Sequence, residues 1–336
     1  MVGGRTLDTS GAGGGCSHAS LRPCGTGMLR VVCSPAPVGL DASGGAFGRR
    51  FVFSIYNAGK IPDTIPVIGF FDSGLGGLAV LKEVEKLLPR YSTVYLGDNA
   101  RTPYGSHSHD TIYRFTRQGV RELFARGARL VILACNTASS SALRRIQQEW
   151  LLRQHPDRRV LGVIIPTAEE VVVRTRSKEV GVVGTEATVQ SFAFPREITK
   201  LDKNIVVHQQ ACPLLVPIIE AGEMEWEGLG LAVGKYVGEL FLKSKRIDTL
   251  VLGCTHYALI EDMFRRYIPS GVAIVSQGVI VAQKIADYLV RHPEIETTLD
   301  ASGSREFLTT EDSWRVRELF RLFYGEGIVP RKIALR

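Results

Sequence analysis

The sequence predicts an α/β protein built from two similar domains, each with a doubly wound parallel sheet. Two observations support this fold class. From about residue 66 onward, short apolar runs rich in β-branched residues alternate with longer amphipathic stretches. Such alternation is typical of βαβ units, whose parallel strands carry helices on both faces. In addition, a weak internal repeat gives each half a glycine turn after one strand and a cysteine after a later strand. If the repeat is real, the two domains face one another across a cleft and each contributes one cysteine.

The apolar runs define the expected elements in chain order. Amphipathic helices are expected at 77–88 and 110–127 and around 140–150. Strands are expected at 66–71, 93–97, 129–135, 159–165, 179–184, 248–254 and 272–276. Ligands of such sheets bind beyond the carboxyl ends of the strands, so the residues that follow each strand are the informative ones.

Residues 1–64 differ from the rest of the chain. Residues 1–48 contain 12 of the 35 glycines, mixed with Ser, Ala and Pro and without helical or strand periodicity. We expect a disordered extension, or upstream sequence included ahead of the true start. No charged segment followed by an apolar one appears at the start, so we expect no secretory signal.

Composition excludes several classes of protein. With 45% hydrophobic and 22% charged residues in 336, the chain is typical of globular proteins. The net charge of +7 comes without a Lys/Arg cluster interleaved with aromatics, which argues against a nucleic-acid partner. A small anionic substrate fits this charge equally well. No run of about 18 apolar residues is present, so we expect no membrane span.

The six cysteines show no CxxC spacing. Neither a disulfide framework nor a zinc ribbon is therefore indicated, and reduced thiols in the cytoplasm are expected.

Cys135 and Cys254 are the strongest candidates for chemistry. Each ends a predicted strand and precedes a predicted helix, in the contexts LVILAC-NTAS and LVLGC-THYA. A thiol at a helix N-terminus gains from nearby N–H groups and from the helix dipole, both of which favour the thiolate. A single cysteine in this position is often only a small buried side chain. Two cysteines in matching contexts favour a functional pair.

Polar residues follow other strands. Asp72 and Ser73 precede a turn of small residues, Asp98 follows another strand, and His256 lies two residues after Cys254. An Asp near one thiol and a His near the other could orient or deprotonate the sulfurs. Helix capping, turn formation or a satisfied core histidine are the alternative explanations. We expect no metal, because only Cys254 and His256 of the potential zinc ligands are close in sequence.

From about Pro66 to the C-terminus the chain resembles the glutamate racemases of the aspartate/glutamate racemase family. The resemblance rests on several motifs in the family's order, namely GFFDSGLGG, GDNARTPYG, ACNTAS, VGVVGTEATVQS, ACPLLVPIIEAGE, LGCTHYALI and FLTTED. It implies two α/β domains related by pseudo-symmetry, with the active site in the cleft between them. The domains implied are 65–160 plus 270–336 and 161–269, after an extension over 1–64.

The resemblance also implies roles for particular residues. Cys135 and Cys254 match the thiols on opposite faces of the substrate α-carbon, and Asp72 and His256 match the side chains that assist them. The substrate-contacting residues implied by the resemblance, with Asp98 added from its place after a strand, are Asp72, Ser73, Asp98, Tyr104, Gly105, Asn136, Thr137, Thr255 and His256. No cofactor and no metal is used in this family.

The chain departs from the family pattern in three places. Where the family often has GVIEPG this chain reads GVIIPT, with Ile165 in place of the Glu and Thr167 nearby. Ala258 replaces the usual Pro of CTHYP, and 276–278 matches the late Ser-Gly turn only loosely. A role of the family's Glu therefore cannot be transferred. Ile165, as the end of a strand, is expected to point either into the cleft or into the core.

The resemblance predicts a cytoplasmic, cofactor-independent enzyme that interconverts L- and D-glutamate and supplies D-glutamate for peptidoglycan. An aspartate or other amino-acid racemase with the same thiol pair is one alternative. An inactive relative that binds an amino acid is another. The sequence leaves the oligomeric state open, with a homodimer as one candidate.

Overall fold

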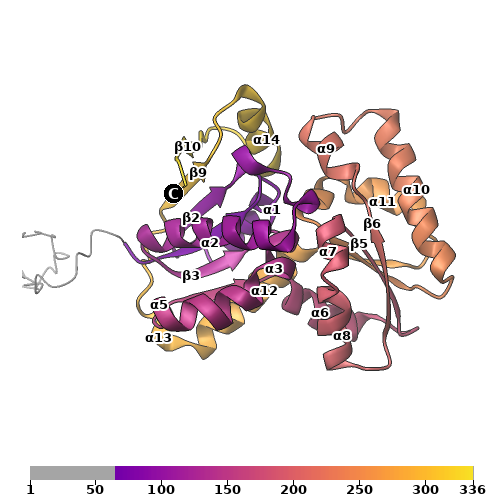
Figure 1. The fold of residues 1–336 in the computed structure, drawn as a ribbon, viewed down its shortest axis with the longest axis horizontal. Coiled ribbons are helices and arrows are strands. Elements are labelled where there is room, and N and C mark those ends of the chain that lie inside the picture. The colour runs from indigo at the N-terminus through magenta and orange to yellow at the C-terminus, as the bar shows by residue number, and fades with distance from the viewer. Residues whose placement is uncertain (1–64, 336) are drawn as a thin grey trace, which may run out of the picture. The chain divides into compact units, whose positions relative to one another are not determined.

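The computed structural model describes residues 65–335, and our expectation for 1–64 lies outside this range. The described chain forms two sheets in which every strand pair is parallel (Figure 1). The first sheet has the order β10-β9-β2-β1-β3-β4, with bounds β1 Val67–Asp72, β2 Thr93–Gly97, β3 Ala128–Leu133, β4 Arg159–Gly162, β9 Arg305–Thr309 and β10 Arg331–Lys332. The second has the order β6-β5-β7-β8, with bounds β5 Glu179–Gly184, β6 Val206–Ala211, β7 Thr249–Gly253 and β8 Ala273–Val275. The α/β class and the two parallel sheets are as predicted.

The two sheets share one strand order. In the first sheet β2-β1-β3-β4 lie side by side, and in the second β6-β5-β7-β8 repeat the same order of second, first, third and fourth strand. Cys135 follows β3 and Cys254 follows β7, which are the third strands of the two sets. The internal repeat suspected from the sequence therefore corresponds to a repeated topology, and it places the two cysteines at equivalent positions.

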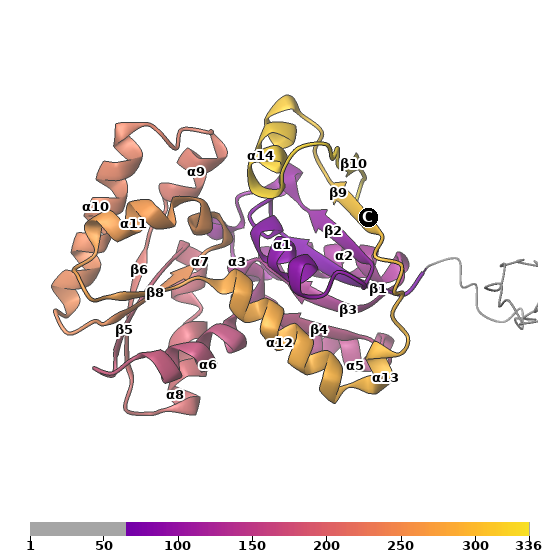
Figure 2. The ribbon, with the colours of Figure 1, turned by 180° about the vertical axis from the view of Figure 1, so that it is seen from behind.

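Alternate side chains of each strand enter different cores. Ile68 and Phe70 of β1 pack on one face of the first sheet, and Val67 and Phe71 pack on the other. The first face is covered by α1 Leu78–Leu87, α12 Gln277–Arg291, α13 Pro293–Glu296 and α14 Trp314–Tyr324 (Figure 2). The second face is covered by α2 His109–Ala125, α3 Asn136–Ser141, α4 Leu143–Arg145 and the π-helical segment η3 Ile146–Leu151, which continues into α5 Leu152–Gln154. Burial of one such large apolar side chain stabilises the fold by roughly 1.5–3 kcal/mol.

The second sheet is covered in the same way. Leu250 and Leu252 of β7 face one core and Val251 faces the other. The helical segments of this half are α6 Ile164–Arg174, α7 Glu186–Gln190, α8 Ala193–Leu201, α9 Leu215–Glu220, α10 Glu227–Lys243, η4 Thr255–Ile260 and α11 Glu261–Tyr267. Two short 3₁₀ turns, η1 Asn99–Arg101 and η2 Tyr104–Ser106, follow β2. Among all these helices, none combines the length and the apolar character needed to cross a membrane.

One expectation from the sequence needs correction. The strand expected at 159–165 ends at Gly162, and Ile165 lies in the first turn of α6. Pro166 follows it in the same turn. The missing N–H of proline costs no hydrogen bond there, because N–H groups of the first turn have no intrahelical acceptor. Ile165 is 49% exposed, so it is neither a strand residue nor a core residue.

The strand pairing also suggests where to place the domain boundaries. β4 pairs with β3 through Gly162, and β8, which falls within the 270–336 assigned to the first domain, pairs with β7 of the second sheet. We therefore propose a first domain of 65–162 plus 277–335 and a second of 164–275.

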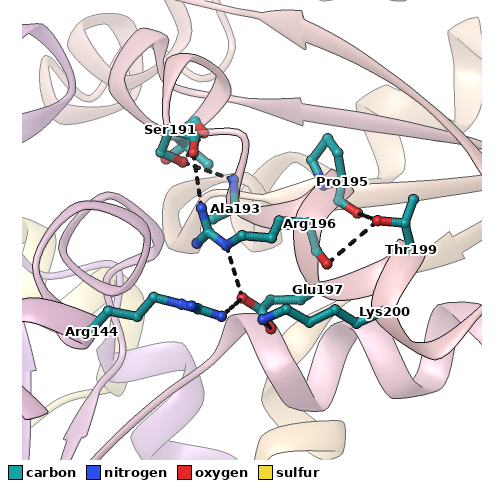
Figure 3. A network of polar contacts seen from close by, with 9 residues as sticks. Arg144, Ser191, Ala193, Pro195, Arg196, Glu197, Thr199 and Lys200 are labelled. Carbon is teal, nitrogen blue, oxygen red and sulfur yellow. Dashed lines mark hydrogen bonds and ion pairs between the residues drawn. The ribbon is translucent and has the colours of Figure 1, made fainter. Parts of the chain in front are cut away.

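A network of charged side chains joins helices of the two halves (Figure 3). Glu197 of α8 accepts bonds from Arg144 of α4 at 2.7 Å, from Arg196 at 3.2 Å and from Lys200 at 3.0 Å. Partial burial opposes the charge of Glu197, but the bonds from Lys200, Arg144 and Arg196 lower its pKa. Glu197 is therefore a carboxylate that holds α4 and α8 together.

Candidate active site

A cavity lies at the carboxyl ends of the two sheets. Most of the residues predicted from the sequence line it. The lining consists of Ser73, Thr102, Pro103, Tyr104, Gly105, Cys135, Asn136, Thr137, Thr185, Val216, Cys254, Thr255 and His256. Both cysteines therefore face one cavity, and each comes from a different sheet.

Cys135 is the N-cap of α3. Its sulfur accepts the N–H of Ala138 at 3.4 Å and lies 3.4 Å from the Ser73 hydroxyl. The side chain is buried, and this burial together with the Asp72 charge raises the pKa of the Cys135 thiol to about 12. Our expectation that the helix N-terminus would lower this pKa is wrong, because removal from water costs the thiolate more than these bonds return. Cys135 is thus a protonated thiol in this structure.

Asp72 ends β1 directly beside Cys135 but does not line the cavity. One carboxylate oxygen, Oδ2, accepts the N–H of Gly77 at 2.8 Å, and the other, Oδ1, is buried without a hydrogen-bond partner. Burial raises the pKa of Asp72, while the His256 charge, the Gly77 N–H and Cys135 oppose the rise. A Cβ at Gly77 would lie 2.8 Å from the Asp72 Cβ, so only glycine allows this bond. Asp72 therefore lies beside Cys135, outside the cavity lining.

Cys254 has a different environment. No backbone N–H caps its sulfur in η4, and its neighbour is the His256 Nδ1 at 3.8 Å. The other ring nitrogen, Nε2, lies 2.9 Å from the Oε1 of Glu220 at the end of α9. Burial opposes protonation of His256, but its bonds to Cys254 and Glu220 raise its pKa well above the usual range. A protonated imidazole stabilises negative charge on the Cys254 sulfur.

The glycine turn after β1 packs tightly against this cysteine loop. A Cβ at Gly76 would lie 2.4 Å from the Thr255 Oγ1 and 2.9 Å from the His256 Nδ1. Real Cβ atoms do not approach so closely, so the contact requires glycine. The FDSGLGG segment of the first sheet thus fixes Thr255 and His256 of the second.

Asp98 is not brought into the cavity. It is fully buried behind Tyr104, whose hydroxyl donates to its Oδ2. Arg101 Nε donates to the same oxygen at 2.6 Å, and the Thr310 hydroxyl donates to Oδ1 at 2.9 Å. Asp98 therefore positions Tyr104, and the expectation that it contacts substrate is not supported by this geometry.

Asn136 and Thr137 line the cavity, but their side chains already have partners. Asn136 Nδ2 donates to Gln277 Oε1 at 2.6 Å, and Gln277 Nε2 donates to Asn136 Oδ1 and to Thr167 Oγ1, each at 2.9 Å. The Thr137 hydroxyl lies 2.9 Å from that of Thr185. Asn136 can therefore offer the substrate its backbone more readily than its amide.

Sequence reasoning missed four residues of the cavity lining and two that bond lining residues, namely Thr102, Pro103, Thr185 and Val216, and Glu220 and Gln277. Glu220 lies within the motif ACPLLVPIIEAGE, but nothing local connects it to His256. Thr185 comes directly after β5, just as Ser73 comes directly after β1, so the internal repeat could have indicated it. For Gln277 the sequence carries no signal, because its partners Asn136 and Thr167 are 141 and 110 residues away.

Between residues 65 and 335, no three His, Cys, Asp or Glu side chains come together as metal ligands would. The donors of the cavity are thiols, hydroxyls, amides and one imidazole, a set suited to proton transfer and to binding a small polar molecule.

Comparisons with known proteins agree with this site. A model of the Asp/Glu/Hydantoin racemase family matches residues 68–285. A glutamate racemase from Jannaschia sp. (strain CCS1) is 43% identical over 273 residues, covering 78% of this chain and 97% of the relative. One from Aquifex aeolicus (strain VF5) is 35% identical over 266 residues, covering 79% of this chain and 96% of the relative.

Solved structures have the same fold. Glutamate racemase RacE1 from Bacillus anthracis superposes with a TM-score of 0.73 at 30% identity, covering 80% of this chain and 98% of the other. Glutamate racemase from Francisella tularensis, solved in complex with D-glutamate, gives a TM-score of 0.71 at 29% identity, covering 80% and 97%. With the two thiols, the repeated sheets and these matches, the chain belongs to the Asp/Glu/Hydantoin racemase family and is an enzyme of the isomerase class.

Proposed function

We propose that this enzyme interconverts L-glutamate and D-glutamate without a cofactor, using Cys135 and Cys254 as two opposed acid–base groups. The observation that carries the proposal is that the two thiols, one from each sheet, line the same cavity. Inversion of an α-carbon needs a base on one face to remove the proton and an acid on the other to return it. The relatives' names supply the substrate, since the Jannaschia and Bacillus anthracis proteins are both glutamate racemases.

The two thiols differ in a way that fits this exchange. Cys135, with its raised pKa, is held as the acid, and Asp72 behind it can take up or return the proton. Cys254 lies beside His256, whose protonated imidazole can stabilise a negative charge on the sulfur, and Glu220 balances the imidazolium charge. In one direction the Cys254 sulfur removes the α-proton while Cys135 donates its proton to the opposite face. After turnover the protonation states are exchanged, and the reverse direction uses the opposite roles.

The cavity must also lower the energy of the carbanion-like transition state. Negative charge that develops on the substrate carboxylate is stabilised by fixed hydrogen-bond donors that need no reorganisation. We assign this role to the groups that line the cavity beside the thiols: Ser73, Tyr104, Gly105, Asn136, Thr137, Thr255 and His256. Asp98 contributes indirectly, because it orients Tyr104.

We further propose that the product D-glutamate is used for peptidoglycan synthesis and that the reaction takes place in the cytoplasm. The described cysteines Cys135, Cys212 and Cys254 are free thiols, and the mechanism needs two of them reduced, a state that the cytosol maintains. A homodimer is the assembly we would test first by light scattering.

The proposal is tested by incubating the purified protein with L-glutamate in D₂O without any added cofactor. We expect D-glutamate to accumulate, detected by loss of circular dichroism, and deuterium to enter Cα, detected by NMR. L-Aspartate serves as the comparison. Discrimination of one methylene is worth only about 1–3 kcal/mol, so aspartate should react more slowly by roughly 10- to 200-fold. Faster reaction of aspartate would assign the alternative substrate, and no exchange with either would identify an inactive binding protein.

A further inference from the structure

Thr102 lines the active-site cavity directly after η1, and the proposed mechanism assigns it no role. Its hydroxyl donates to the Oε1 of Glu220 at 3.1 Å. The same oxygen lies 2.9 Å from the Nε2 of His256. Thr102 follows a strand of the first sheet, whereas Glu220 and His256 follow strands of the second. The pair formed by Glu220 and His256 is therefore completed by a donor from the opposite sheet.

The glycine turn after β1 leaves room for this contact. A Cβ at Gly74 would lie 3.1 Å from the Glu220 Oε1 and 3.4 Å from the Thr102 Oγ1. The first of these distances is tighter than most real Cβ contacts, so a side chain at this position would push against the carboxylate. The turn after β1 and the loop after β2 thus form one wall, and the carboxylate of Glu220 lies against it.

Glu220 depends on such a wall because of its place in the fold. It is the last residue of α9, and its side chain is 18% exposed. A glutamate side chain loses rotamer freedom when it is held in one position, and ion pairs near the surface repay little of that loss. The bond from Thr102 favours the same rotamer as the contact with His256. Two partners of one oxygen therefore hold a side chain that could otherwise turn toward water.

Two other ionisable groups face His256. The Cys254 sulfur lies 3.8 Å from Nδ1, and the buried Asp72 interacts with the imidazole through its charge. Both of these side chains are almost completely buried, so neither has water within reach as an alternative partner. Glu220 is the most exposed of the three groups. A change in its position is thus the simplest way to change the charge around His256.

Helix α14 also approaches this region from the first sheet. Phe323 packs edge-on against the His256 ring, with ring centroids 5.6 Å apart. Arg315 lies beside Gly222, where a Cβ would be 2.7 Å from its Nη1, but its ion pair is with Glu318 at 3.8 Å. The aromatic ring holds the imidazole without adding charge. Within residues 65–335, the side chain of this half that hydrogen-bonds the carboxylate of Glu220 is therefore that of Thr102.

We propose that Thr102 is a positioning residue, whose hydroxyl holds the Glu220 carboxylate against His256. The inference rests on the proposed two-thiol mechanism, in which the imidazolium stabilises negative charge on the Cys254 sulfur. The bond to Glu220 is one of the contacts that raise the pKa of His256. Without the hydroxyl the carboxylate turns toward solvent, its attraction for the imidazolium weakens, and the pKa of His256 falls.

Nuclear magnetic resonance of ¹⁵N-labelled histidines, recorded without substrate, measures this pKa directly. The variant His256→Asn identifies the signal among the seven histidines of the chain. Thr102→Val replaces the hydroxyl by a methyl group of similar size, and the pKa of His256 should fall by roughly 0.5–1 pH unit. Thr102→Ser keeps the donor, so the pKa should stay within about 0.2 of that in the unmodified chain.

The matched control is Thr93→Val. It removes a threonine hydroxyl that donates to Glu85 at 2.8 Å, and neither residue lines the cavity. Glu85 keeps Arg305 and Tyr324 as partners, so the carboxylate stays satisfied after the substitution. His256 should titrate in this variant as it does in the unmodified chain.

The basic limb of kcat for L-glutamate should move to lower pH by the same amount in Thr102→Val and stay in place in Thr102→Ser and Thr93→Val. An unchanged pKa of His256 in Thr102→Val, or an equal fall in either of the other two variants, would overturn the proposal. A fall in the pKa with an unmoved basic limb would refute a role in the reaction. Absence of racemisation by the unmodified chain would contradict the proposed function, and the histidine titration would still decide whether Thr102 positions Glu220.

Discussion

Cys135 and Cys254 occupy equivalent positions in two copies of one topology, yet their surroundings differ. Cys135 caps a helix beside a buried carboxyl, and its pKa is raised to about 12. Cys254 has no capping N–H and instead lies beside an imidazole that is held protonated. In the mechanism that we propose, this asymmetry would let one residue type serve as the acid on one face of the α-carbon and as the base on the other.

Replacement of either thiol should abolish racemisation. In Cys135→Ser or Cys254→Ser the alcohol is a far weaker acid than a thiol, so we expect kcat to fall by at least about 10³-fold. The control is Cys212→Ser, which changes a third buried thiol outside the cavity and should keep kcat within about threefold. Polarimetry of L-glutamate measures all three variants. Near-normal turnover by either active-site variant would contradict the mechanism.

Glu220 should set the basic limb of the pH profile. The raised pKa of His256 keeps the imidazolium at low and neutral pH, and its proton is lost as the pH rises through that pKa. In Glu220→Gln the negative partner is gone, so the pKa of His256 falls and activity should decline at a lower pH than in the unmodified enzyme. The exposed Glu223→Gln, three residues beyond the end of α9, is the matched control. A basic limb at the same pH in both variants would refute this role.

At the scale of secondary structure, the N-terminus of α6 replaces the strand end that the sequence suggested. Ile165 is half exposed there and does not line the active-site cavity. Ile165→Glu should therefore leave racemisation within about twofold and change the free energy of unfolding by no more than about 0.5 kcal/mol. An acidic residue in a first turn is even slightly favourable. A large loss of stability in urea titration would show that Ile165 lies in the core, and a changed KM would show that it lies in the active site.

The segments that connect the two sheets meet at Gln277, the first residue of α12. Its amide joins Asn136 beside Cys135 to Thr167 of α6, and all three are buried. Gln277→Leu leaves the Nδ2 and Oδ1 of buried Asn136 without side-chain partners, which should cost about 2–5 kcal/mol of unfolding free energy. Lys284→Gln breaks an exposed pair with Glu169 between the same two helices and should cost at most about 1 kcal/mol. Equal costs would show that the buried network does not hold the helices together.

At the scale of the whole molecule, we predict that the catalytic fold needs only the part from β1 onward. β1 begins at Val67, and the family match begins at residue 68. A shortened chain that begins at Pro62 should keep its melting temperature within about 2 °C and its racemase activity within about twofold. The reason is compositional, since residues 1–48 contain 12 of the 35 glycines without helical or strand periodicity. A marked loss of either property would show that the extension packs on the enzyme.

The sequence by itself determined the features that depend on local pattern. Alternating apolar runs predicted the parallel strands, because strands buried on both faces must be apolar throughout. The two thiols and several polar residues follow these strands, and the carboxyl ends of parallel strands meet at one edge of a sheet, so the sequence could indicate the thiol pair. Nine of the predicted site residues line one cavity for this reason.

Only the tertiary structure decided which distant groups surround each of these residues. Glu220 bonds His256, which lies 36 positions away in the sequence. Asp98 does not line the cavity and instead accepts a bond from the Tyr104 hydroxyl. The pKa of Cys135 is raised mainly by burial, which outweighs the local bonds from Ser73 and Ala138 that would lower it. Burial and long-range partners depend on how helices and sheets pack, and that packing sets which thiol holds its proton.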